Sequence, residues 1–218
     1  MMPLSDFVAD SVFCIDVRAE MAPLLDRVKE IVRIFPGKLA DESLDMFPRI
    51  SHRAKIILFK NDADGLPIIT ESKFFTISGD SSQEVEYCEY IDSIQAIGGV
   101  NGVSTPFEAL DAALNSDWSR TEGKLRQLIF LFTNATESEY TEQNRDFRHS
   151  VLESSDPFTC DSARYPALMP RRSRKIIVAP QKSSLYKISE YSGTFFIPIA
   201  DLSELDIDLV INCVIPGL

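Results

Sequence analysis

Histidine is scarce in this sequence, and the motifs of several common enzyme classes are missing. The 218 residues include only two histidines, His52 and His149, and a Ser-His-Asp or Cys-His catalytic group is hard to assemble from so few. Both fall in segments that we predict to be loop or surface, so we expect them to be solvated and idle. No glycine-rich dinucleotide fingerprint or P-loop follows a predicted strand, and no Gly-x-Ser-x-Gly elbow exists, which disfavours nucleotide-binding and serine-hydrolase chemistry.

Cysteine pairs, long apolar runs and an excess of positive charge are also lacking. The four cysteines form no Cys-x-x-Cys pair, which excludes zinc-ribbon spacing, and Cys14 and Cys213 lie in apolar runs typical of core thiols. No apolar segment reaches about 18 residues, and no signal peptide is visible. The formal net charge of −11 disfavours nucleic acid and anionic membranes as partners. We therefore expect a soluble protein of the reducing cytoplasm.

Short apolar runs alternate with amphipathic helical patterns along the chain. The runs predict six strands, at residues 12–15, 56–59, 74–77, 128–132, 176–179 and 195–197, of which the one at 74–77 is expected at an edge of the sheet. Apolar residues at helical spacing predict helices near residues 21–35, 85–94, 106–114, 185–188 and 202–210. We expect Pro36-Gly37 to end the first helix and Gly98-Gly99 the second. The alternation predicts an α/β fold: a Rossmann-like, doubly wound, mostly parallel six-stranded sheet with helices on both faces.

One stretch departs from this alternation. Residues 137–173 are irregular, and we predict a single domain over residues 1–218 with an insertion at about 137–173, because no repeat or low-complexity linker is present. Long loops of this kind tend to be functional or disordered, so the insertion is one candidate partner surface.

The residues that leave the strands are the candidates for a site, because ligands of such sheets collect at the carboxyl ends of the strands. Asp16, Arg18 and Glu20 follow the first strand, and Thr133 and Asn134 follow the most apolar one. Ser104 and Thr105 precede the helix near residues 106–114, where Thr105 has a simpler interpretation as a helix cap.

These three loops, in this order, resemble the von Willebrand factor A (vWA) domain. That family has Asp-x-Ser-x-Ser after its first strand, a threonine in its second loop and an aspartate after its fourth strand. Residues 13–24, 98–110 and 128–135 look like these motifs. Residues 107–110, 116–118 and 176–180 resemble a bacterial cytoplasmic branch of the family. The resemblance covers nearly the whole chain except residues 140–171, and it implies a Rossmann-like fold with a metal-ion-dependent adhesion site (MIDAS).

The sequence departs from the family at the metal ligands. Arg18 and Glu20 stand where the family has two serines, and Asn134 stands where it has aspartate, while Asp16 and the hydroxyl of Thr105 or Ser104 are kept. Our hypothesis is that Arg18 pairs with Asp16 and replaces the metal, because a cation beside a divalent ion is repelled. The alternative is that Asp16, Glu20 and Thr105 still hold magnesium while Arg18 swings outward.

The resemblance implies a protein–protein interaction module and not an enzyme. The partner protein would bind at the strand-end face, where Arg18 could receive an acidic residue directly, and no cofactor is expected apart from magnesium in the alternative. The bacterial branch implies a place in a multi-protein system. Two further hypotheses stay open: a metal-assisted hydrolase that uses Asp16 and Glu20, and a scaffold that binds elsewhere.

Overall fold

The computed structural model describes residues 7–43, 50–61, 67–77, 82–98, 106–120, 124–135, 173–190, 193–199 and 205–214. Seven strands lie in these ranges: β1 (Phe7–Asp16), β2 (Ile50–Asn61), β3 (Pro67–Glu71), β4 (Phe75–Ile77), β5 (Lys124–Phe132), β6 (Ser173–Pro180) and β7 (Thr194–Ile199). The helices are η1 (Ala19–Met21), α1 (Ala22–Ser43), α2 (Ser82–Ser93), α3 (Pro106–Leu114), η5 (Ser184–Glu190) and α6 (Ile207–Val214). Within these ranges, no helix combines the length and apolar character that a membrane crossing needs.

All seven strands form one sheet with the order β3-β2-β1-β5-β6-β7, and β4 also pairs with β2. The pairs β1–β2, β1–β5, β5–β6 and β6–β7 are parallel, whereas β3 and β4 run antiparallel to β2. The chain moves outward from β1 first to one side and then to the other, so the strand order reverses between β1 and β5. In open α/β sheets this reversal leaves a crevice at the carboxyl ends of the two strands.

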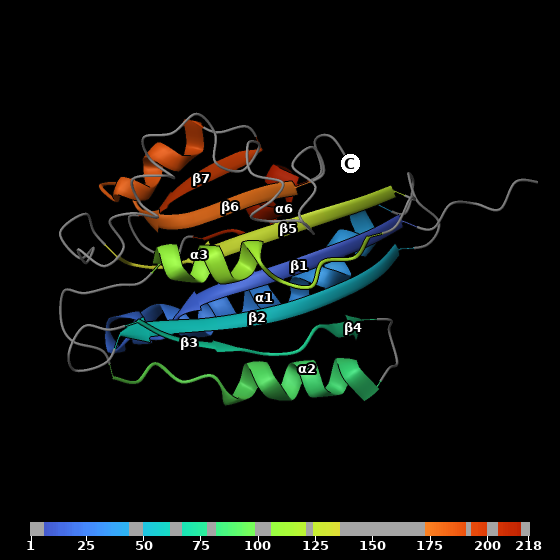
Figure 1. Ribbon diagram of the computed structural model, residues 1–218, viewed down its shortest axis with the longest axis horizontal. Coiled ribbons are helices and arrows are strands. Elements are labelled where there is room, and N and C mark those ends of the chain that lie inside the picture. The colour runs from blue at the N-terminus through green and yellow to red at the C-terminus, as the bar shows by residue number, and fades with distance from the viewer. Residues whose placement is uncertain are drawn as a thin grey trace, which may run out of the picture.

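Helices cover both faces of the sheet, as Figure 1 shows with α3 in front of β1 and α1 behind it. Successive residues of β1 point to opposite faces: Phe13 and Ile15 belong to the apolar cluster that contains α1, α2 and α6. Val12 and Cys14 belong to the cluster that contains α3 and η5. Because both faces are buried, the central strands contain continuous apolar runs towards their carboxyl ends, such as residues 12–15 of β1 and 128–132 of β5. The predicted doubly wound, mostly parallel α/β fold is confirmed.

The sheet has one strand more than the six predicted. β3 was not predicted, because it is only five residues long and both Ile68 and Thr70 are exposed, so it lacks the apolar signal of a buried strand. Its strand conformation comes from antiparallel pairing with β2, which joins Ile69 to Phe59 and Pro67 to Asn61. β4, predicted at residues 74–77, is present beside β2.

The prediction that Pro36-Gly37 ends the first helix is wrong. Helix α1 continues through Pro36 to Ser43. Proline has no backbone N–H, so it cannot donate to the carbonyl of Val32 one turn earlier. The hydroxyl of Tyr87 on α2 donates to that carbonyl at 2.8 Å instead, and α1 therefore passes the proline without leaving a buried acceptor unpaired.

Helix α2 ends before the predicted stop at Gly98-Gly99, and its predicted apolar stripe is buried at Ile91 and Ile94 but not at Val85. It ends at Ser93, five residues before Gly98, because the backbone then runs extended towards the carboxyl end of β1. Tyr87 and Ile91 are buried, whereas Val85, which we had placed on the apolar side, is 59% exposed.

The expectation that both histidines are solvated is wrong for His52. This residue lies in β2, is 3% exposed, and bonds through Nε2 to the hydroxyl of Ser11 at 2.8 Å. A polar pair between two central strands interrupts their apolar runs, which is why the sequence alone indicated a loop at this position.

His149, Cys160 and residues 137–172 of the predicted insertion lie outside the described residues.

Candidate functional site

Two strand ends bring the candidate site together. β1 ends at Asp16, and the backbone then stays extended through Arg18, whose φ and ψ are −64° and 159°. A hydrogen bond from the amide of Val17 to the carbonyl of Phe59 keeps this segment against β2. On the other side, the amide of Thr133 donates to the carbonyl of Val178 just after the end of β5. Because β1 and β5 are neighbours, both exits open at the same edge of the sheet.

An ion pair between Asp16 and Arg18 occupies the centre of the site. The guanidinium Nε of Arg18 lies 3.1 Å from each carboxylate oxygen of Asp16, and Nη2 lies 2.9 Å from Oδ2. The amide of Arg18 also donates to Oδ1, at 3.0 Å. The two side chains are 1% and 0% exposed. Residues two apart on an extended backbone point the same way, which brings the two charges together.

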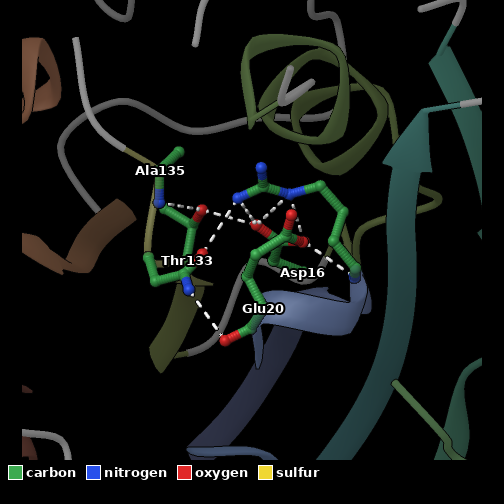
Figure 2. Close-up of polar contacts among 6 residues, drawn as sticks. Asp16, Glu20, Thr133 and Ala135 are labelled. Carbon is green, nitrogen blue, oxygen red and sulfur yellow. Dashed lines mark hydrogen bonds and ion pairs between the residues drawn. The ribbon is translucent and has the colours of Figure 1, made fainter. Parts of the chain in front are cut away.

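Two residues from the end of β5 complete this network, which Figure 2 shows around Asp16. The hydroxyl of Thr133 donates to Oδ2 of Asp16 at 2.8 Å and accepts from the amide of Ala135 at 3.0 Å. The side chain of Asn134 accepts from Nη2 of Arg18 and donates to the backbone carbonyl of Glu20, each at 2.9 Å. An ionised aspartate at position 134 could accept but not donate, so the asparagine can bond to both the guanidinium of Arg18 and the carbonyl of Glu20 where an aspartate could bond only to the first.

The residues in this site do not fit a divalent cation. Each carboxylate oxygen of Asp16 already accepts at least two hydrogen bonds, which fills the lone pairs that a metal would need. The buried guanidinium of Arg18 stands against the same oxygens and would repel a second cation. In the described ranges, no group of three or more histidine, cysteine, aspartate or glutamate side chains could hold a metal.

The predicted site residues have different outcomes. Asp16, Arg18 and Asn134 come together, and the predicted ion pair is present. Glu20 takes part through its backbone carbonyl, and its carboxylate oxygen Oε2 is buried without a hydrogen-bond partner. Ser104 and Thr105 lie outside the described residues.

One participant was not among the predicted site residues. Thr133 was recognised as a residue that leaves a strand, but it was not counted with the site. Its hydroxyl bonds directly to Asp16. The available signal was its position as the first residue after the most apolar strand, which in a parallel sheet places it beside the end of the neighbouring strand.

Comparison with known proteins gives a structural likeness without a sequence relative. No protein-family model and no curated protein matches the chain. Two structures of proximal thread matrix protein 1 from the mussel byssus match with a TM-score of 0.54, at 12% and 13% identity, over 97% and 96% of this chain. A further structure of that protein, with a zinc-occupied MIDAS motif, matches with the same TM-score at 12% identity over 97% of this chain.

The chain spans about half of the matched mussel chains, 48% of each. At such low identity the likeness concerns the fold. The chain therefore has a vWA-like, Rossmann-type α/β fold, with the network of Asp16 and Arg18 at the carboxyl ends of its central strands.

Proposed function

We propose that this chain is a non-enzymatic interaction module that binds a partner protein at its strand-end face, defined here as the surface of residues 16–20 and 133–135. A fixed ion pair would take the place of the metal ion of a MIDAS. The observation that carries the proposal is the buried guanidinium of Arg18, which donates hydrogen bonds to both carboxylate oxygens of Asp16 and to the side chain of Asn134. A tethered cation of this kind supplies positive charge to the carboxylate without depending on a metal.

In this proposal Arg18 positions the face and does not contact the partner. Its side chain is 1% exposed, so an acidic residue of a partner could not reach the guanidinium as the sequence had led us to expect. The contact surface is instead made by neighbours such as Ala19, which is exposed, and Asn134, which is half-buried. The network holds the loop after β1 against the loop after β5, and such pre-organisation lowers the entropic cost of binding.

Two observations support a role without catalysis. The carboxylate of Asp16 has its lone pairs occupied, so it is poorly placed to act as a base or nucleophile. His52, the histidine in the described ranges, is buried near the amino end of β2, at the opposite end of the strands from Asp16. The resemblance to the bacterial cytoplasmic branch is what supports a bacterial cytoplasm as the proposed location of this module. The free thiols of Cys14, Cys88 and Cys213 are compatible with that compartment.

Site-specific photocrosslinking in the native cell tests the binding face. A photoreactive amino acid at Ala19 should give a discrete adduct with the partner, whereas the same group at Ser51, exposed at the amino end of β2, should not. Purified wild-type protein should bind the identified partner. Ala19→Arg should abolish binding through steric bulk, and Ser51→Arg should preserve it. Normal binding by Ala19→Arg would contradict the proposal.

A thermal melt with magnesium, manganese or calcium tests the metal-free state. The wild type should show no upward shift in Tm over a chelator control. Arg18→Ser should gain one, because it removes the tethered cation and leaves a hydroxyl beside Asp16. The buried, unpartnered oxygen of Glu20 is the observation that favours the competing interpretation, in which Asp16, Glu20 and Thr105 hold a cation. A wild-type shift that Glu20→Gln removes would establish that alternative.

A further inference from the structure

The segment after α2, residues 94–98, lies against the loop that carries Arg18. Helix α2 ends at Ser93, so Gly98 lies beyond the helix and does not cap it. The segment instead runs towards the end of the sheet where β1 exits, as Figure 1 shows. The sequence predicted Gly98 as a helix stop, and a glycine at this position therefore needs another explanation.

Two backbone hydrogen bonds join this segment to the loop, one on each side of Arg18. The amide of Ile97 donates to the carbonyl of Val17 at 2.9 Å, and the amide of Ala19 donates to the carbonyl of Gly98 at 3.0 Å. The amide of Val17 also donates to a carbonyl of β2. The backbone that carries Arg18 is therefore held on two sides, by β2 and by residues 94–98.

The segment is itself anchored along its length. Ile94 is 3% exposed and belongs to the apolar core. The ammonium of Lys29 on α1 donates to the carbonyls of Asp92 and Ile94, at 3.0 and 3.1 Å, and a lysine so placed satisfies carbonyls that the end of a helix leaves open. The ammonium of Lys60 lies 3.3 Å from the carbonyl of Ile97. The segment can therefore position the loop that is bonded to it.

The backbone conformation of Gly98 explains why a glycine stands there. Its φ is 74°, in the left-handed region that a residue with a Cβ atom enters only at a cost. Space does not exclude a side chain, because an added Cβ atom would lie 3.4 Å from Nζ of Lys60, the end of a flexible side chain. The carbonyl that this conformation presents is the one that accepts from Ala19.

We propose that residues 94–98 are a backbone clamp that fixes Ala19 at the strand-end face, with Gly98 as its positioning residue. The inference rests on the proposed function, in which Ala19 contacts the partner protein. The ion pair with Asp16 holds the side chain of Arg18, whereas the clamp holds the backbone on each side of it. Backbone that is ordered before binding lowers the entropic cost of association, so a loosened clamp weakens partner binding while the ion pair persists.

Amide hydrogen exchange in the full chain, followed by NMR, tests the clamp without a partner. In Gly98→Ala the methyl group disfavours the left-handed φ, and the amide of Ala19 should exchange about tenfold faster, which corresponds to about 1.4 kcal/mol. Gly98→Asn also adds a side chain, but asparagine tolerates this region, so exchange should stay within about twofold of the wild type. Unchanged exchange of the Ala19 amide in Gly98→Ala would overturn the clamp.

Gly193→Ala is the matched control. Gly193 has a φ of 71° and directly precedes β7, at the opposite end of the sheet from Asp16. An added Cβ atom there would lie 2.9 Å from the carbonyl oxygen of Ser173, so this variant should lose at least as much stability in urea. Exchange of the Ala19 amide should nevertheless stay at the wild-type rate. Equal acceleration in both alanine variants would mean that Ala19 responds only to global stability, and it would refute the clamp.

Binding of the partner that crosslinks at Ala19 tests the positioning role. Gly98→Ala should weaken binding of the purified partner about tenfold, and Gly98→Asn and Gly193→Ala should keep it within about twofold. Normal binding by Gly98→Ala would overturn the positioning role and leave the proposed function intact. If Ala19→Arg also binds normally, the proposed function fails and the positioning role with it, whereas the exchange experiment still decides whether the clamp exists.

Discussion

The guanidinium of Arg18 donates to both carboxylate oxygens of Asp16, and neither side chain is more than 1% exposed. Two opposite charges have thus been removed from water together. The cost of their desolvation is offset only while both are present.

Removal of the cation should therefore destabilise the fold strongly. Arg18→Met leaves the carboxylate of Asp16 buried without its counter-ion, and we expect a loss of about 3–5 kcal/mol in the free energy of unfolding, measured by urea denaturation. The double variant Asp16→Asn/Arg18→Met removes both charges and should lose less than the sum of the single variants, with a coupling of about 1–3 kcal/mol. Additive losses would mean that the pair contributes no interaction energy of its own.

A second prediction concerns the proline inside α1. Tyr87→Phe removes the hydroxyl that bonds to the carbonyl of Val32, and it should cost about 1–3 kcal/mol, the penalty for an unsatisfied buried acceptor. In a Pro36→Ala background the new amide can donate to the same carbonyl, so the cost of Tyr87→Phe should be clearly smaller. Both are measured by urea denaturation.

Tyr186→Phe is the matched control for this cycle, since Tyr186 is 58% exposed and its change should stay within about 0.5 kcal/mol. An equal cost of Tyr87→Phe in both backgrounds would show that the hydroxyl does not replace the missing helical bond.

A third prediction follows from the burial of His52, which lowers its pKa from 6.5 to about 4. The unfolded chain takes up a proton near pH 6.5, whereas the folded chain does so only near pH 4, so the unfolded state binds more protons between these values. The contribution of His52 to the free energy of unfolding is therefore fully present above about pH 6.5. It is lost as the pH is lowered towards 4, by about 3 kcal/mol for a pKa shift of this size.

His52→Gln isolates this contribution, because glutamine does not titrate and can still bond to Ser11. The difference in unfolding free energy between wild type and His52→Gln should move in favour of the variant as the pH falls from 7 to 4.5. Chemical denaturation at each pH measures it. A difference that does not change with pH would contradict a depressed pKa for His52.

The sequence predicted the central strands well because each lies between two layers of helices. Residues 128–132 are apolar at every position, and they form the carboxyl-terminal part of β5 (Lys124–Phe132). The strand ends could also be predicted, since parallel strands place their carboxyl ends together. Thus Asp16 and Asn134 were expected at one site although they are far apart in the chain, and the structure joins both to Arg18.

The predictions failed where a contact between residues far apart in the sequence overrode the local conformational preference of a residue. Pro36 ordinarily ends a helix, but Tyr87 satisfies the carbonyl that the proline leaves open. His52 and Ser11 are polar, yet they form a hydrogen bond with each other between two strands. β3 is a strand because β2 lies beside it.

By itself, the sequence determined the α/β architecture and put Arg18 two residues after Asp16, where an extended chain can bring their side chains together, because apolar patterning and the two-residue period of extended chain are local properties. It did not determine where the remaining hydrogen bonds of that cation go. Arg18 bonds to Asn134, 116 positions away in the chain, and Thr133 reaches Asp16 across a similar separation. Only the tertiary structure decided these contacts, because they exist only when β1 and β5 lie side by side.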